Sequence, residues 1–201
     1  NYSGVESNPE AMRLLDGYIQ NGWLQEFGTL QELQKYVGVS PVLNKLACIS
    51  KHRRGWTWKH RMIMDSKRSG VTEASNKQFR TVRPRQTDLM SDTLELLALA
   101  QPAEAVFYMV LDAVDAYWQL LLHTNERRFF CAVLRRPGKQ PTYLVFNRTL
   151  QGSRGAPLSW TAIFGLVCRL AFLTLRCPVT PNASRMEVYV DDPICALLGT
   201  R

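Results

Sequence analysis

Two adjacent carboxylates, Asp191 and Asp192, stand at the end of an apolar run and constrain the fold more than any other feature of this chain. Each carboxylate is costly to desolvate and the two repel each other, so stability alone does not favour placing them side by side. A divalent cation would neutralise both. Because successive residues of a strand point to opposite faces, the two side chains reach one ion most easily where they flank a tight turn between strands.

A third carboxylate would complete a metal-binding set. Asp112 follows the apolar residues 109–111, which indicate a buried strand leading directly to it, although 79 positions separate it from Asp191. We expect the fold to bring Asp112, Asp191 and Asp192 together. The alternative for Asp112 is a turn or cap residue. Asp115, three residues further on, is interpreted as a structural or helix-capping residue.

Four segments, in this order along the chain, resemble the reverse transcriptase (RNA-directed DNA polymerase) family of retroelements. They are KHRMIMD (59–65), VLDAVDAYW (110–118), LQGSRGAP (150–157) and YVDD (189–192). Any strand may end in two acidic residues, but four blocks in the family's own order and with compatible spacing are specific. The resemblance runs from about residue 45 to residue 195.

The order of the elements predicts an α+β fold with helices on one face of a small antiparallel sheet. Helices are expected within residues 9–36, with a second one capped by Thr29 and stopped by Gly38, and from Ser91 or Asp92 to Ala100. A long helix should run from Pro157 to about Leu175 and be buried. Strands are expected at 41–49, 59–64, 105–112, 131–135, 143–146 and 186–190.

The resemblance implies the fingers and palm of a right-hand polymerase, with the thumb absent. It assigns residues 1–104 and 119–156 to the fingers, and residues 105–118 and 157–201 to the palm. The rest of the palm, the thumb and any RNase H or integrase domain are expected beyond the last residue. Because the first residue is not Met, we expect a fragment of a longer polyprotein that is inactive in isolation.

The implied reaction is the addition of deoxynucleotides to a primer paired with an RNA or DNA template. Two Mg²⁺ ions about 4 Å apart, or Mn²⁺ in their place, would activate the 3′-hydroxyl and neutralise the leaving pyrophosphate. Such ions prefer oxygen ligands and keep some of their waters. The resemblance assigns metal binding to Asp112, Asp191, Asp192 and the backbone carbonyl of Ala113, with the three carboxylates as the catalytic residues.

The same resemblance implies a site for the incoming nucleotide. Arg61 and Lys51 would hold the triphosphate, since a guanidinium offers a planar fork of donors and an ammonium a point charge. A neighbouring basic residue could replace Lys51. Tyr117 would lie under the sugar and exclude a 2′-hydroxyl, or it could simply pack in a core. Gln151 and Gly152 would lie against the nucleotide, or form only a turn before a helix.

The net charge of +8 is unevenly spread. Residues 45–85 contain twelve Lys and Arg against two acidic residues, a net charge of +10, with Trp56, Trp58 and Phe79 interleaved. This pattern indicates a polyanionic partner, whereas a solvated surface is the alternative. We predict that nucleic acid contacts Arg53, Arg54, Arg83, Arg85 and Arg154.

Three further features bear on where the chain acts and whether it is active. The five cysteines form no CxxC pair, which indicates free buried thiols in a reducing, intracellular compartment. No run of about 18 apolar residues appears, so no membrane partner is expected. Pro193 directly follows the acidic pair and removes a ladder donor, so the hairpin there is expected to be altered.

Two alternatives to an active reverse transcriptase stay open. One is a catalytically dead, nucleic-acid-binding remnant of a retroelement. The other is an RNA-dependent RNA polymerase, which Tyr117 disfavours because enzymes that make RNA need a smaller or polar residue at that position.

Overall fold

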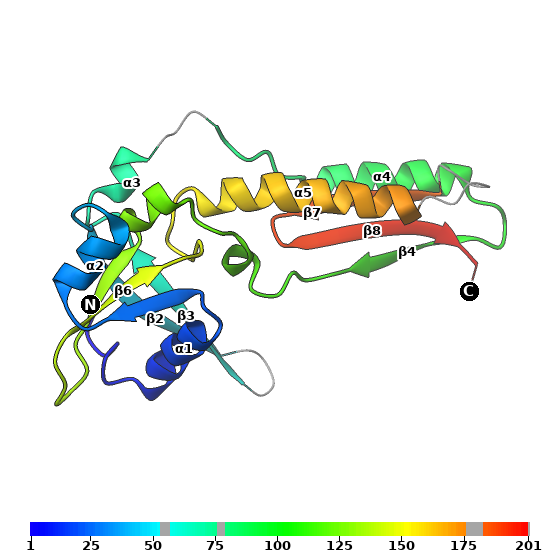
Figure 1. The fold of residues 1–201 in the computed structure, drawn as a ribbon. Coiled ribbons are helices and arrows are strands. Elements are labelled where there is room, and N and C mark those ends of the chain that lie inside the picture. The colour runs from blue at the N-terminus through cyan, green and yellow to red at the C-terminus, as the bar shows by residue number, and fades with distance from the viewer. Residues whose placement is uncertain (53–56, 76–78, 176–182, 201) are drawn as a thin grey trace. The chain divides into compact units, whose positions relative to one another are not determined.

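The computed structural model describes residues 1–52, 57–75, 79–175 and 183–200. The chain divides into two compact units, the first comprising residues 1–76 and 117–156 and the second residues 77–116 and 157–201. The first unit contains a mixed five-stranded sheet and the second a three-stranded antiparallel sheet (Figure 1). The prediction of an α+β fold is therefore confirmed.

The first unit is built on a sheet with the strand order β1–β6–β5–β2–β3. Its strands are β1 (Leu24–Phe27), β2 (Leu43–His52), β3 (Trp58–Asp65), β5 (Cys131–Leu134) and β6 (Thr142–Phe146). Strands β2 and β5 run parallel, and the other neighbouring pairs run antiparallel. The strands expected at 131–135 and 143–146 are present as β5 and β6, and they pair with Cys131 opposite Val145.

The helices of the first unit are α1 (Pro9–Gln20), α2 (Leu30–Val37) and the short α3 (Val71–Ala74). The predicted limits of α2 are confirmed. Thr29 and Glu32 cap its start reciprocally, and Gly38 ends it in the left-handed region at φ 77°. Short 3₁₀ helices cover Ala116–Gln119 (η1) and Thr124–Phe129 (η2).

The core of the first unit lies between α1 and the sheet. Strand alternation turns Leu46, Met62 and Met64 inward, where none of them is exposed. Trp118 extends this core, because its ring stacks on Trp23 with centroids 5.3 Å apart. The unit therefore has an ordinary packed interior.

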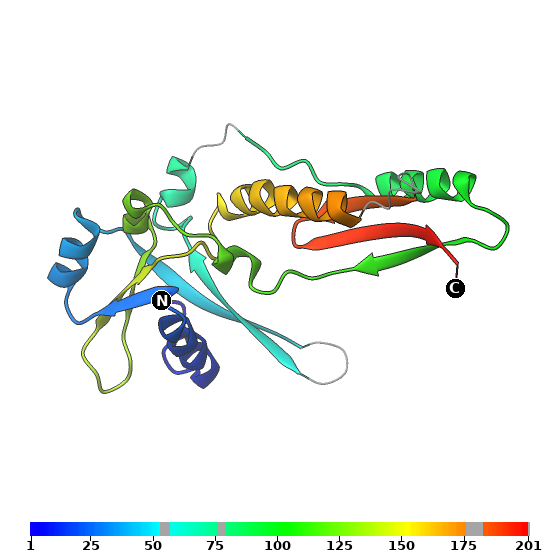
Figure 2. The ribbon, with the colours of Figure 1, turned by 45° about the vertical axis from the view of Figure 1, so that its right-hand side comes forward.

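The second unit contains β4 (Ala105–Val110), β7 (Ser184–Tyr189) and β8 (Asp192–Gly199), in the order β4–β8–β7. Helices α4 (Gln86–Leu99) and α5 (Ala156–Leu175) lie over one face of this sheet (Figures 1 and 2). The central strand β8 begins at Asp192, so this residue of the acidic pair belongs to the sheet itself.

Three expectations about element limits differ from the structure. Helix α4 begins at Gln86 rather than at Ser91 or Asp92, because Asp88 already accepts a hydrogen bond from the Arg85 N–H at 2.6 Å. Strand β1 lies within residues 9–36, for which only helices were predicted. Residues 77–104 were assigned with the fingers, whereas α4 packs on β4, β7 and β8 and groups with the second unit.

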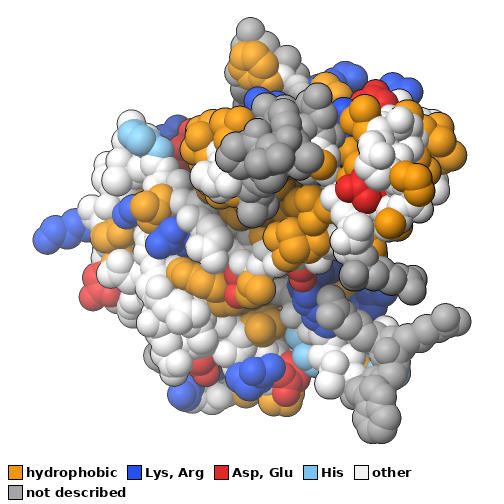
Figure 3. All heavy atoms as spheres, turned by 90° about the vertical axis from the view of Figure 1, so that its right-hand side faces the viewer, with side chains coloured by type: hydrophobic (Ala, Val, Ile, Leu, Met, Phe, Trp, Pro, Cys, Tyr) orange, Lys and Arg blue, Asp and Glu red, His pale blue; other side chains and the backbone are white. Residues whose placement is uncertain are grey.

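The prediction that the long helix is buried is wrong. Ile163, Leu166 and Leu170 of α5 are each more than half exposed, and 17% of the stretch 156–174 is buried. A helix on one sheet buries one stripe, and α5 is apolar around most of its circumference. By length and composition α5 could also cross a membrane, a test that core helices of soluble proteins pass as well. Hydrophobic side chains are prominent at the end of this unit facing the viewer in Figure 3.

Cysteines in the described part of the chain are free thiols, as expected. Cys131, Cys168 and Cys195 are buried and Cys48 is partly buried, and Cys177 lies outside the described residues. Burial raises the pKa of the Cys131 thiol to about 12, so this group packs as a small apolar side chain.

Candidate functional site

The hairpin between β7 and β8 carries the acidic pair. Tyr189 pairs with Asp192, so the turn consists of Val190 and Asp191 alone. The turn is tight, as expected, but Asp191 lies within it rather than flanking it. Val190 has φ 60°, whereas Asp191 is not in the positive region. This combination of signs is that of a type II′ turn. A β-branched residue in this position is unusual and costs about 1–3 kcal/mol.

Asp112 lies directly across the sheet from Asp192. The β4–β8 register places Val110 opposite Ile194, and it continues two residues beyond the end of β4. Asp112 and Asp192 are thus a non-hydrogen-bonded pair, whose side chains share one face of an antiparallel sheet. Two backbone hydrogen bonds flank the pair, from Leu111 N to Pro193 O at 3.1 Å and from Ala113 N to Asp191 O at 2.9 Å.

The three carboxylates also interact electrostatically. Partial burial raises the pKa of Asp192, and the negative charges of Asp191 and Asp112 raise it further. In the described part of the chain no group of three or more acidic, Cys or His side chains is arranged to hold a metal. A divalent cation suits this donor set, since Mg²⁺ takes carboxylate oxygens and keeps waters.

Pro193 does not alter the hairpin, contrary to the sequence expectation. It is buried within β8, opposite Val188, and the register runs through it without a bulge. Its carbonyl still accepts a hydrogen bond from Leu111 N, so the missing N–H removes only the reciprocal ladder bond to Leu111, just beyond the end of β4.

Two residues predicted to contact nucleic acid belong to the second unit and have local partners there. The guanidinium of Arg83 lies over the Tyr189 ring, 5.7 Å from its centroid, next to the turn. Arg85 precedes α4 and donates its backbone N–H to Asp88. Arg53 and Arg54 lie outside the described residues.

In the first unit, β2 and β3 bring the two predicted triphosphate contacts to one face. Arg61 lies opposite Ile49 and Lys51 lies opposite Lys59, so strand alternation places all four side chains on the same side, where the three cations are exposed. Sequence reasoning did not select Lys59. The signal that identifies Lys59 is its spacing of two residues from Arg61, which puts both side chains on the same face of β3.

The loop at Gln151 and Gly152 packs on the end of β3. Met64 N donates to the Gln151 carbonyl at 3.0 Å, and Ser66 Oγ donates to the Gly152 carbonyl at 2.9 Å. Gly152 has φ 98°, and a Cβ there would lie 2.0 Å from the Met64 carbonyl oxygen. Glycine is thus required at position 152 because the backbone of β3 lies against it, and not because of a bound nucleotide. The nucleotide-binding assignment of this loop stays a prediction.

The neighbouring aromatic residues Tyr117 and Trp118 have different environments. Trp118 is 2% exposed and packs in the core, whereas Tyr117 is only partly buried. The backbone carbonyl of Tyr117 accepts a hydrogen bond from Thr149 Oγ1 at 2.6 Å, which fixes the start of η1. Core packing is therefore the role of Trp118, and the proposed contact of Tyr117 with a sugar stays a prediction.

Two further residues have structural roles that the sequence indicates only in part. Asp115 is exposed at φ 54°, a conformation that Asp tolerates better than most residues, which agrees with a structural role. Arg154 donates to the Thr72 carbonyl at 3.1 Å and so ties its loop to α3.

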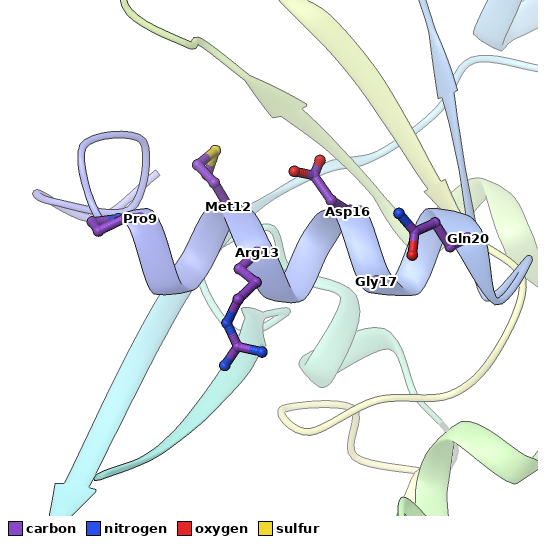
Figure 4. Close-up of a pocket in the computed structure, with 6 residues that line it drawn as sticks. All are labelled: Pro9, Met12, Arg13, Asp16, Gly17 and Gln20. Carbon is purple, nitrogen blue, oxygen red and sulfur yellow. The ribbon is translucent and has the colours of Figure 1, made fainter.

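A shallow pocket of about 590 Å³ lies on the surface of α1 (Figure 4). All of its lining residues come from this one helix and its first turn, and none is a predicted site residue. They are Pro9, Met12, Arg13, Asp16, Gly17 and Gln20. A surface formed by a single helix encloses little of a ligand, so the pocket supports no assignment.

No protein-family model matches the chain, and no curated protein sequence matches it. The candidate residues therefore rest on the geometry within each unit. They are the carboxylates of Asp112, Asp191 and Asp192 in the second unit and the cationic face of Lys51, Lys59 and Arg61 on β2 and β3 in the first unit.

Proposed function

We propose that the chain is the fingers and palm portion of a reverse transcriptase, and that it serves template-directed DNA synthesis. The observation that carries this proposal is the pairing of Asp112 with Asp192, next to Asp191, from segments 79 residues apart. Three carboxylates gathered at a strand end and a hairpin turn repel one another, and a pair of bound divalent cations would neutralise this repulsion.

In this proposal Asp112 and Asp191 provide the main ligating oxygens, assisted by Asp192 and the carbonyl of Ala113. Two bound Mg²⁺ ions would supply activation of the primer 3′-hydroxyl and neutralise the charge on the pyrophosphate. The rigid β4–β8 pairing fixes where the carboxylates stand, which matters because Mg²⁺ demands near-ideal octahedral geometry.

The cationic face of the first unit supports the same function. Lys51, Lys59 and Arg61 present donors on one side of β2 and β3, as required to hold a polyphosphate. Tyr117 is proposed to lie under the sugar of a deoxynucleotide, and Gln151 and Gly152 beside it. We further propose that Arg53, Arg54, Arg83, Arg85 and Arg154 contact the template and primer.

The test is primer extension on an RNA template by the full-length parent protein, with deoxynucleotides and Mg²⁺. Asp191→Asn should abolish extension, because it removes a metal ligand, while leaving template binding intact. Exposed Asp115→Asn is the matched control and should leave extension unchanged. Extension that survives in Asp191→Asn would refute the two-metal assignment.

A second candidate is a nucleic-acid-binding remnant without catalysis. The charge distribution favours it, because the first unit has 17 Lys and Arg against eight acidic residues, a net charge of +9, whereas the second unit has a net charge of −1. Binding of RNA by the parent without any Mg²⁺-dependent extension would support this candidate. Extension with ribonucleotides instead would indicate an RNA polymerase.

A further inference from the structure

Trp160 contacts the turn that carries the acidic pair. It lies in the first turns of α5 and is 5% exposed, and its indole Nε1–H donates to the Val190 carbonyl at 2.9 Å. Its ring stacks on Phe164, with centroids 4.7 Å apart and an angle of 18° between the planes. The hydrogen bond therefore joins α5 to the turn between β7 and β8.

The Val190 carbonyl belongs to the central peptide of the turn. Rotation of this peptide converts a type II′ turn into a type I′ turn, and both turns are compatible with a two-residue hairpin. In the type I′ form Asp191 would also need a positive φ, which it does not have. The rotation would therefore change the direction in which the Asp191 side chain leaves the backbone.

The residue at position 190 does not favour the observed turn by itself. Glycine is the preferred residue at the first position of a type II′ turn, and this chain has a β-branched valine there. The turn therefore depends on contacts from outside the hairpin, and among the hydrogen bonds in the described part of the chain, the one from Trp160 holds the peptide that decides the turn type.

We propose that Trp160 is a positioning residue that holds the Val190–Asp191 peptide in the type II′ orientation and so directs the Asp191 carboxylate relative to the Asp112–Asp192 pair. Its consequence for metal binding rests on the function proposed above. Its consequence for the shape of the turn does not.

The test compares four variants of the 201-residue chain. Trp160→Phe keeps an aromatic ring on Phe164 but lacks the N–H donor. Phe164→Leu is the matched control, because it disturbs the same stack and keeps the donor. Val190→Gly gives the turn its preferred residue, and the double variant Trp160→Phe/Val190→Gly asks whether this change replaces the lost hydrogen bond.

Two quantities are measured: the affinity for Mn²⁺ alone by calorimetry, and the NMR chemical shifts of the Asp191 backbone. Loss of one hydrogen bond predicts that Trp160→Phe weakens Mn²⁺ binding roughly five- to tenfold and moves the Asp191 shifts. Phe164→Leu and Val190→Gly should each stay within about twofold of the unmodified chain. The double variant should recover the affinity of Val190→Gly.

Unchanged Mn²⁺ affinity and unchanged Asp191 shifts in a folded Trp160→Phe protein would overturn the proposal. A double variant as weak as Trp160→Phe would overturn it too, because the N–H would then act elsewhere than on the turn. If Trp160→Phe does not fold, the indole N–H signal of the unmodified chain, assigned through its contact with Phe164, decides the question. It should be protected from exchange and should move when Mg²⁺ is added.

Failure of the proposed function gives a different result. If Asp191→Asn binds Mn²⁺ as tightly as the unmodified chain, the carboxylates are not the metal site and the polymerase assignment fails. The effect of Trp160→Phe on the Asp191 chemical shifts would still test the positioning role of Trp160, because these shifts report the conformation of the turn and require no metal.

Discussion

Asp112 and Asp192 face each other across β4 and β8 as a non-hydrogen-bonded pair, so the Cα atoms of two like-charged residues lie at the closest approach that an antiparallel sheet allows. Asp191 adds a third charge beside them, and the pKa of Asp192 is raised by burial and by both neighbours. An arrangement that opposes folding stability in this way is typical of residues that serve binding or catalysis.

This relationship predicts a trade between stability and metal binding. Asp192→Asn removes one of the opposed charges and should increase the free energy of unfolding by about 0.5 kcal/mol, measured by urea denaturation in the presence of a chelator. The same variant should bind Mn²⁺ more weakly. Asp115→Asn, at an exposed turn position that Asn tolerates, should change neither quantity. A less stable Asp192→Asn protein would show that the pair is not a repulsive one.

Gly152 offers a sharp test of how its loop packs. Gly152→Ala places a Cβ against the Met64 carbonyl at a backbone angle that alanine rarely adopts, and should destabilise the first unit by at least about 2 kcal/mol. Gly155→Ala is the control from the same loop, because a Cβ there meets no atom within 4 Å. Thermal unfolding monitored by tryptophan fluorescence measures both. Equal melting temperatures for the two variants would contradict the observed packing.

A partly buried ion pair predicts how the first unit responds to acid. Arg136 binds Glu26 and also lies 3.7 Å from Asp16, which ties the β5–β6 hairpin to β1 and α1. Burial alone would raise the pKa of Glu26, but hydrogen bonds from Arg136 and Thr142 outweigh it and lower this pKa below its ordinary value of 4.5.

Because the pKa is lower in the folded state, the stabilisation is present above about pH 4.5 and is lost as the pH falls through the folded value. Glu26→Gln should therefore cost about 1 kcal/mol of unfolding free energy at pH 7 and progressively less below pH 4.5. Urea denaturation across this pH range provides the measurement. Exposed Glu73→Gln should show no such pH-dependent difference, and a constant deficit in Glu26→Gln would rule out the ionic explanation.

The cationic face predicts the salt dependence of nucleic-acid binding. If Lys51, Lys59 and Arg61 contact phosphates, replacing each by Gln should reduce the slope of log K against log salt by about 0.7–0.9 per contact. Fluorescence anisotropy with a labelled primer–template at several salt concentrations measures the slope. Lys35→Gln, on α2, is the control that should leave it unchanged. An unaltered slope in the triple variant would mean that this face is only solvated surface.

The parts of the fold that sequence could predict are those fixed by neighbouring residues. The ends of α2 follow from Thr29 and Gly38, whose capping needs no distant partner. Strand β8 was not predicted, because Pro193 argues against a strand by local rules and only the pairing with β4 and β7 overrides it. The long helix α5 was predicted to be buried because it is hydrophobic, and this was wrong. Burial depends on how many other elements cover the helix, which is a property of the whole unit and cannot be seen in the helix's own sequence.

The candidate site shows the same division. Chemistry and order along the chain were enough to select Asp112, Asp191 and Asp192, because few other roles suit those residue types. Trp160 could not be selected, since an apolar helix containing one tryptophan looks like ordinary core until its N–H is found on the Val190 carbonyl. Lys59 escaped for a similar reason, because its face depends on the β2–β3 register.

Tyr117 gives the most specific prediction about the reaction, because it concerns one ring. The ring is only partly buried, whereas core packing is carried by Trp118. If Tyr117 fills the space that a 2′-hydroxyl would occupy, Tyr117→Val should open that space. Steric overlap in a packed site costs about 1–3 kcal/mol, so ribonucleotide incorporation should rise roughly 10- to 100-fold.

The measurement is single-nucleotide extension by the full-length parent with deoxy- and ribonucleotides in parallel, and the quantity compared is the ratio of kcat/KM for the two sugars. Tyr117→Phe should keep the original ratio, because it keeps the ring and loses only the hydroxyl. The Mg²⁺ dependence of Tyr117→Val should be unchanged, since no metal ligand is removed. If the ratio is the same in Tyr117→Val and in the unmodified protein, the ring does not select the sugar, and the proposal of DNA rather than RNA synthesis loses its strongest single-residue support.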